Sequence, residues 1–179
     1  FVVKNPLNHR RAGVLLHPTS LPGTCEQGNI GQAARRFVDF LQSAGISVWQ
    51  MLPLGPTHAD HSPYQCLSAH AGNTELICLE DLAGTGWLSL EAARNAAHDD
   101  CLKQAKSGFD ALARPAQKGA FTRFKHTHAF WLDDYSLYQA IRQQHDNRSW
   151  YQWPDALRDW QQACAVRDEY AEWTEQVCF

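Results

Sequence analysis

The chain has 179 residues, which is enough for one domain with a substantial core but short of the roughly 250 that a closed eight-stranded barrel enzyme takes. Apolar residues make up 44% of the sequence and charged residues 20%, which is typical of a globular protein and argues against disorder. The net charge is −3 and no Lys/Arg cluster stands out, so we expect neither a nucleic-acid nor a membrane partner. No apolar run reaches the roughly 18 residues that would span a bilayer.

The six cysteines lie at positions 25, 66, 78, 101, 164 and 178, without a C-x-x-C pair. No signal peptide precedes them, so we expect reduced thiols and a cytoplasmic protein. The first residue is Phe1 rather than an initiator methionine, which leaves a removed targeting segment open. The common nucleotide, hydrolase and metalloprotease motifs are absent, and we expect no cofactor.

The first half predicts strand, helix, strand. Residues 12–16 form an apolar strand after a surface lead-in at 1–11, and a loop with three glycines follows at 23–31. Residues 32–44 show the spacing of an amphipathic helix that Gly45 ends, and 48–54 form a second strand. Two apolar strands joined by one helix indicate a parallel βαβ unit.

Helices dominate the second half. The pattern leaves 76–82 open between a strand and a packed loop, and then predicts a helix over 89–108 with Ser89 as N-cap and Gly108 as stop. Residues 121–141 form one long helix or two that meet near Thr127. An aromatic turn at 148–154 precedes helical spacing over 155–177. We therefore divide the chain into 1–82, with the strands and their loops, and 83–179, mainly helical.

The loop after the second strand mixes an aromatic ring with polar groups. Ser62, Tyr64 and Gln65 place a hydroxyl, a flat ring and an amide on backbone that Pro63 stiffens. Such a mixture suits a sugar, whose apolar face lies on a ring and whose hydroxyls need hydrogen bonds. The alternative is an ordinary turn in which Tyr64 is a core aromatic. Asn73 could bind a sugar too, but we expect it to cap its own turn.

The amino-acid sequences of these loops resemble those of the amylomaltase family of 4-alpha-glucanotransferases. LPLGPT, SPYQ and SA-x-AGN follow one another within 52–73, and GVLLHPTSLP at 13–22 resembles the family's first barrel strand and its loop. WLDDYSLYQAI at 131–141 and WYQWPDALR at 150–158 extend the match. The resemblance implies an α/β fold, the first part of a (β/α)8 TIM-type barrel with a mainly helical insertion. The barrel would be incomplete here, because the match covers about the first third of the family's polypeptide.

The resemblance also implies a reaction. A retaining transfer of α-1,4-glucan segments needs two carboxyl groups roughly 5 Å apart. The family's catalytic carboxylates belong to later strands, so we assign no catalytic residue; the acidic side chains weighed and set aside are Asp60, Glu80, Asp81, Asp133 and Asp134. For substrate binding we carry over Tyr64, Ser62 and Gln65, and then His17 and Ser20 of the first loop. His17 could equally be a satisfied, half-buried polar group.

Two stretches depart from the family. Where members of the family usually have Gly-Tyr-Gly-Asp, this chain has His58, Ala59, Asp60 and His61. The family's aromatic residue that stacks on glucan is therefore absent from this stretch. His70 and Thr74 replace a family Phe and Pro. These changes put the outer glucan subsites in doubt more than the reaction. His58 and His61 are three apart, but with one nearby carboxylate and no Cys in the loop we expect no metal.

Two hypotheses remain. The chain is the N-terminal portion of a 4-alpha-glucanotransferase acting on maltodextrins, inactive by itself, or it is a non-catalytic glucan-binding or interaction module. The second is motivated by Trp150, Trp153 and Tyr64, which we expect to be exposed. The oligomeric state is left open.

Overall fold

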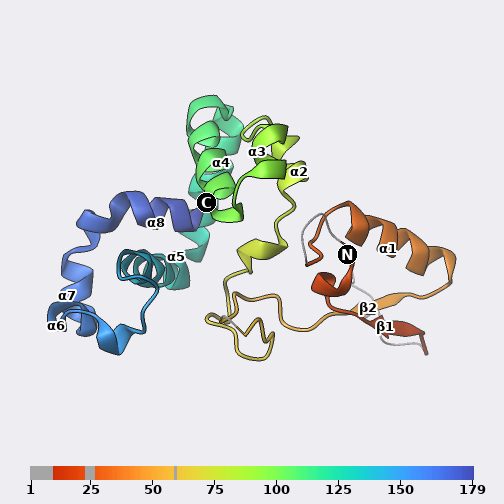
Figure 1. Ribbon diagram of the computed structural model, residues 1–179, viewed down its shortest axis with the longest axis horizontal. Helices are drawn as coiled ribbons and strands as arrows, with labels where there is room; N and C mark the ends of the chain where they lie inside the picture. Colours follow the sequence, from red (N-terminus) through yellow and green to blue (C-terminus); the bar gives the residue numbers. More distant parts are fainter. Residues whose placement is uncertain (1–9, 23–26, 59) are drawn as a thin grey trace. The chain divides into compact units, whose positions relative to one another are not determined.

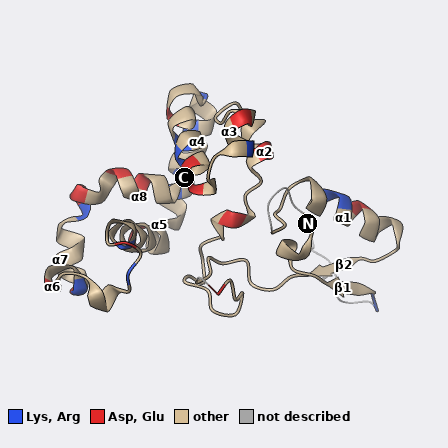
Figure 2. Ribbon diagram, in the orientation of Figure 1, with Lys and Arg blue, Asp and Glu red and all other residues tan. Residues whose placement is uncertain are grey.

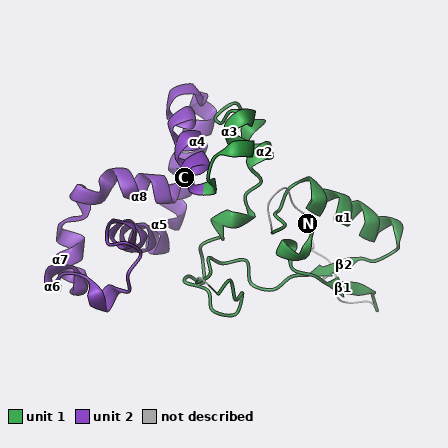
Figure 3. Cartoon of the chain, viewed as in Figure 1, with its two compact units in different colours: residues 1–98 green, residues 99–179 purple. Residues whose placement is uncertain are grey.

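The computed structural model describes residues 10–22, 27–58 and 60–179, and the chain divides into two compact units, 1–98 and 99–179 (Figure 3). Most of the lead-in at 1–11, part of the loop at 23–31, Cys25 and Ala59 lie outside the described residues. The functional division at residue 82 stays a prediction.

A parallel βαβ unit opens the first unit, as predicted (Figure 1). Strand β1 (Gly13–Leu15) pairs in parallel with β2 (Val48–Gln50), with Val14 opposite Trp49. Two further backbone bonds, from the Leu16 amide to Gln50 and from the Ser47 amide to Ala12, extend the ladder at both ends. The second strand is shorter than the predicted 48–54, because Pro53 and Gly55 follow closely and neither favours a strand interior.

Helix α1 (Gln32–Ser43) connects the two strands, and its apolar face contacts β2. Leu41 is 4% exposed, and the Phe37 ring meets the Trp49 ring edge to face at 5.0 Å. The Trp49 indole donates to the Leu16 carbonyl at 2.8 Å. Gly45 follows the helix with φ +71°, a left-handed conformation that glycine adopts without strain, so it ends the helix as predicted.

After the loop at 51–73, the remaining elements of the first unit are helical, which corrects one prediction. The segment 76–82 is neither strand nor loop throughout: a 3-10 turn, η2 (Thr74–Leu76), leads into helix α2 (Leu79–Ala83). Helix α3 (Leu90–Asn95) follows, with the Ser89 hydroxyl accepting from the Ala92 amide as the predicted N-cap. Asn73 caps its own turn, as expected, because its side chain accepts from the Glu75 amide at 3.0 Å.

A bidentate ion pair links α2 to α1. The Arg35 guanidinium donates to both oxygens of Asp81 at 2.7 and 2.8 Å, and these bonds lower the pKa of the Asp81 carboxyl below its ordinary value of 3.8. A carboxyl whose pKa is lowered by folding stabilises the fold above its unfolded pKa, and the contribution is lost as the pH falls through the folded pKa.

We therefore expect Arg35→Gln to lower the stability of the first unit at pH 7. Both side chains are about half exposed, so the effect should be small and sensitive to salt. The difference from the unchanged protein should shrink as the pH falls below about 4. Urea unfolding at pH 7 and pH 2.5 measures it, and an equal difference at both values would contradict the assignment.

The second unit is built from helices alone in the part of the chain that the structure describes (Figure 1). Its elements are α4 (His98–Leu112, which begins one residue before the boundary), α5 (Pro115–Gln144), η3 (Trp150–Gln152), α6 (Asp155–Arg158), α7 (Trp160–Ala165), η4 (Arg167–Tyr170) and α8 (Ala171–Cys178).

The helix boundaries differ from two predictions, and they decide between the two alternatives left open for residues 121–141. The predicted helix over 89–108 is two helices, since Ala96 is extended and Asp99 and Asp100 begin the first turn of α4, where negative charge is favourable. Gly108 lies inside α4, and the stop comes before Pro115. Helix α5 starts at that proline and continues through Thr127, because no Gly or Pro lies between Gly119 and its end at Gln144.

Residues 155–177 form several short helical segments rather than one helix. Asp159 interrupts the run, because its side chain accepts from the Gln162 amide and caps α7. The aromatic turn at 148–154 is present as η3 and the residues around it.

A single apolar cluster holds α5, α7, η3 and η4 together. Its buried members are Leu137, Ala140, Ile141, Trp153, Ala163 and Tyr170. Trp153 is 2% exposed and its indole donates to the Arg148 carbonyl, so the expectation of an exposed Trp153 is wrong. Its ring lies 5.3 Å from that of Tyr138, which explains the burial. Trp150 and Tyr64 are exposed, as expected.

Surface properties agree with the composition. Acidic and basic side chains are interspersed along the helices (Figure 2). The cysteines within the described residues are free thiols. None of the described helices combines the length and the hydropathy needed to cross a membrane.

Candidate functional site

Two loops leave the same edge of the parallel sheet, because β1 and β2 both end there. The loop after β1 begins with His17 and continues into a 3-10 turn, η1 (Pro18–Ser20). The loop after β2 runs from Met51 to Asn73. Together they carry all five side chains predicted to bind substrate.

His17 connects the two loops. Its Nδ1 lies 2.8 Å from the Thr19 hydroxyl and also accepts from the Thr19 amide, while its Nε2 lies 3.4 Å from the Pro53 carbonyl. In a neutral ring these partners favour the tautomer with the proton on Nε2, donated to the Pro53 carbonyl. The ring therefore fastens the end of one loop to the start of the other, as a satisfied polar group does. Ser20 is exposed on the same turn.

The Ser62–Gln65 segment is a closed β-turn. The Gln65 amide donates to the Ser62 carbonyl at 3.1 Å, with Pro63 at the second position, which its fixed φ suits. The Cys66 thiol donates to the Pro63 carbonyl at 3.2 Å. The turn thus presents Ser62, Tyr64 and Gln65 from a well-bonded backbone.

Tyr64 is 76% exposed, so it is not a core aromatic. Gln65 is also exposed and Ser62 is half-buried. An exposed ring on a rigid turn can accept the apolar face of a sugar without first being released from packing. The assignment of these three residues, of His17 and of Ser20 to substrate binding stays a prediction.

The five acidic side chains weighed in the sequence all have a partner within the chain. Asp60 accepts from the Ser62 amide at 3.2 Å, and Glu80 from the Cys78 thiol at 3.3 Å. Asp81 pairs with Arg35. Asp133 and Asp134 are exposed on α5 and lie 4.0 and 3.4 Å from Arg167. None of these contacts indicates two carboxyl groups placed on either side of a glycosidic bond, as a retaining transfer needs.

Across the described residues no group of three or more His, Cys, Asp or Glu side chains could hold a metal ion. His61 has Glu75 as its neighbour, with Nδ1 3.5 Å from the carboxylate oxygen Oε2. The absence of a metal at this loop stays a prediction.

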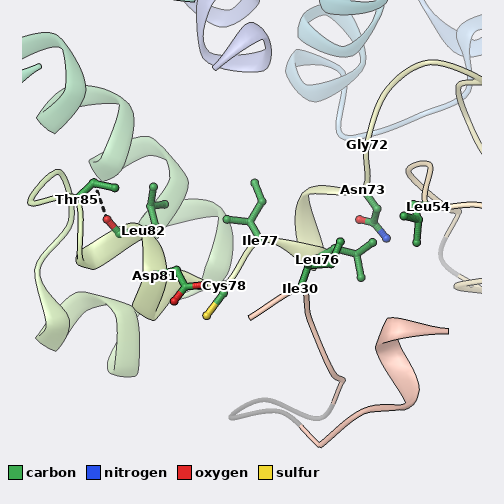
Figure 4. A pocket seen from close by; sticks show the side chains of 10 residues that line it. All are labelled: Ile30, Leu54, Gly72, Asn73, Leu76, Ile77, Cys78, Asp81, Leu82 and Thr85. Carbon is green, nitrogen blue, oxygen red and sulfur yellow. Dashed lines mark hydrogen bonds between the residues drawn. The ribbon is translucent and has the colours of Figure 1, made fainter. Parts of the chain in front are cut away.

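A mainly apolar pocket of about 540 Å³ lies within the first unit (Figure 4). It is lined by Ile30, Leu54, Gly72, Asn73, Leu76, Ile77, Cys78, Asp81, Leu82 and Thr85. Burial raises the pKa of the Cys78 thiol, which argues against a reactive thiolate. The pocket contains none of the predicted sugar-binding residues, and its apolar lining offers few hydrogen bonds to hydroxyls. The exposed turn at 62–65 is therefore the better candidate site.

Sequence reasoning missed the contact between His61 and Glu75. Their spacing carries no helical or strand period that would bring them together. The one signal was that His61 falls in the stretch that departs from the family pattern.

The comparisons with known proteins agree across nearly the whole chain. A family model described as 4-alpha-glucanotransferase matches residues 16–179. The 4-alpha-glucanotransferase of Thermus thermophilus is 41% identical over 181 residues, covering 95% of this chain and 36% of the relative. That of Synechocystis sp. is 38% identical over 177 residues, covering 86% and 35%.

A solved structure agrees as well. An amylomaltase from Streptococcus agalactiae in complex with acarbose matches with a TM-score of 0.84 and 29% identity, over 94% of this chain and 38% of that one. The chain spans about a third of the length of the curated relatives it matches.

Proposed function

The chain belongs to the 4-alpha-glucanotransferase family, and on that basis we propose that it is the N-terminal portion of an enzyme that transfers α-1,4-glucan segments between maltodextrins. The observation that carries the proposal is the family match over residues 16–179. The names of the relatives supply the reaction class, and the structural relative with bound acarbose supports a carbohydrate ligand.

The reaction would proceed by retaining double displacement. One carboxylate would attack the anomeric carbon as a second carboxylic acid protonates the departing oxygen. A sugar hydroxyl of the acceptor would then displace the enzyme carboxylate and give its proton to the second carboxylate. We assign neither carboxyl to this chain, since the family's carboxylates belong to later strands and the acidic side chains near the loops have other partners. Asp60 and Asp81 are examples. The two catalytic carboxyl groups would belong to the part of the enzyme that corresponds to the uncovered two thirds of the relatives.

The chain would supply substrate contacts from its two loops. Tyr64 would lie under the sugar beside the bond that breaks, where its exposed ring can cover the apolar face of the pyranose. Ser62 and Gln65 would bond sugar hydroxyls from the same turn. His17 and Ser20 would contribute from the loop after β1, with His17 held in place by Pro53.

We also propose that residues 1–82 are the first strands, helix and active-site loops of a (β/α)8 barrel in a cytoplasmic enzyme, and 83–179 a helical insertion. The parallel pairing of β1 with β2 supports this, since parallel strands in proteins belong to larger, covered sheets. Leu15 of β1 is 57% exposed, an apolar surface that further elements of a barrel would cover.

A glucan-binding module without catalysis is the second candidate. The exposed rings of Tyr64 and Trp150 favour it, but Trp153 is buried and offers no surface for a sugar. The relatives that match the same residues are named as transferases, which favours the first candidate.

Maltotriose turnover tests the proposal. The intact polypeptide made by the chain's own gene should release glucose and form longer maltodextrins, and its mass should be well above that of the 179-residue chain. The 179-residue chain alone should produce neither product. Turnover by this chain alone would contradict the placement of the carboxylates, and an intact polypeptide without turnover but with saturable maltodextrin binding would favour the second candidate.

A further inference from the structure

The loop that carries Tyr64 is closed at its base. Thr57 and Cys66 face each other in an antiparallel bridge, and the Leu67 amide donates to the Pro56 carbonyl at 2.7 Å. With the base fixed, the orientation of the Ser62–Gln65 turn depends on the contacts made by the residues at the far end of the loop.

His61 lies at the tip with φ +52°, a left-handed conformation that is uncommon for a residue with a side chain. Its amide donates to the His58 carbonyl at 2.9 Å, and the next residue, Ser62, begins the turn with Tyr64. Backbone of this kind persists where the surroundings hold it. A contact made by the His61 side chain is thus directly coupled to the orientation of the turn.

That contact reaches a separate, well-anchored element. The His61 Nδ1 lies 3.5 Å from Glu75 Oε2, and Glu75 belongs to η2. The turn η2 is fixed by Asn73, whose amide donates to the Leu54 carbonyl, and by Leu76, which is 4% exposed and whose carbonyl accepts from Ile30. The His61 side chain at the tip of the loop therefore lies next to Glu75 of η2, which is fixed by backbone hydrogen bonds within the same unit.

We propose that His61 and Glu75 form a latch that positions the Ser62–Gln65 turn for glucan binding. This inference rests on the proposed function, and it treats both members as positioning residues that need not touch the sugar. The two side chains carry opposite charges only when His61 is protonated. The contact is therefore stronger with a protonated than with a neutral His61.

Other titratable groups lie close to His61 in the chain. They are His58, Asp60 and Tyr64 in the loop itself, and Asp60 already accepts from the Ser62 amide. A pH effect belongs to the latch only if removing the charge of Glu75 abolishes it. Glu75→Gln is the decisive variant, because the amide keeps the size of the side chain. His61→Asn is the reciprocal variant, since asparagine tolerates a left-handed backbone.

Maltodextrin affinity of the intact polypeptide, measured by calorimetry at pH 5.5 and pH 8.0, tests the latch. Both side chains of the pair are about half exposed, so we expect about 2-fold to 5-fold tighter binding at pH 5.5. Glu75→Gln and His61→Asn should both bind at pH 5.5 as weakly as the unchanged protein does at pH 8.0, with little change between the two. Glu172→Gln on α8 removes an exposed carboxylate elsewhere and should keep the full pH response.

Amide hydrogen exchange without sugar separates the latch from the proposed function. Relative to intrinsic rates, Ser62, Tyr64 and Gln65 should be more protected at pH 5.5 than at pH 8.0, and less so in Glu75→Gln. The same protection in both proteins, or an equal pH response of affinity in both, would overturn the latch. Protection that follows the latch while no protein binds maltodextrin would instead overturn the proposed function.

Discussion

Replacement of Leu137 by alanine should lower the free energy of unfolding of the second unit by about 2–5 kcal/mol. Leu137 is fully buried at the centre of the cluster that joins α5 to η3, α7 and η4. Alanine removes three buried carbons and leaves a cavity beside Ile141 and Trp153, which are themselves closely packed. Urea unfolding followed by circular dichroism measures the change.

Leu112→Ala is the matched control. The substitution is identical and lies in the same unit, but Leu112 is 67% exposed near the end of α4. We expect a change within about 0.5 kcal/mol, as is usual for surface positions. A loss at Leu137 no larger than that at Leu112 would mean that the cluster does not hold the second unit together.

The sequence was most informative where short-range patterns agree with tertiary packing. The spacing of apolar residues between Ala34 and Ala44, with Gly45 after them, predicts α1, and its apolar face does contact β2. The strand at 12–16 is apolar enough to be recognised, and it pairs as expected. One helix between two such runs leaves a parallel pair as the natural arrangement.

The predicted helix ends were wrong where two helix-stop signals lie close together in the sequence. Gly108 looks like a helix stop, yet α4 passes it, because a glycine in a helix interior costs only about 1 kcal/mol and tertiary packing of Phe109 outweighs it. Pro115 is the stronger signal, since it restricts Arg114 and favours the first position of α5. Burial of Trp153 was also missed, because a tryptophan beside a proline reads equally well as surface.

The candidate site shows the same contrast. A contiguous stretch such as Ser62–Gln65 can be recognised because its residue types and turn chemistry are local, and the closed turn follows from Pro63. The tie between His61 and Glu75 depends on how the loop folds back on η2, which no periodicity encodes. Sequence therefore indicates which side chains could meet a sugar, and the structure is needed for what orients them.

Replacement of Tyr64 by alanine should lower kcat/KM for maltodextrins by about 10-fold to 100-fold in the intact polypeptide, which corresponds to the roughly 1.5–3 kcal/mol gained by burying an aromatic side chain. The fold should be unaffected, because Tyr64 is 76% exposed and its ring is not part of the buried core. Steady-state kinetics with maltotriose measures the first effect and thermal unfolding the second.

Two further variants separate the ring from its hydroxyl and from aromatic exposure in general. Tyr64→Phe keeps the stacking face and should retain most of the activity, since the ring supplies the contact with the apolar face of the sugar. Tyr151→Ala removes another exposed tyrosine ring, 61% exposed in η3, and should leave kcat/KM unchanged. Equal losses in Tyr64→Phe and Tyr64→Ala would assign the effect to the hydroxyl, and a loss in Tyr151→Ala as large as that in Tyr64→Ala would move the glucan contact away from the 62–65 turn.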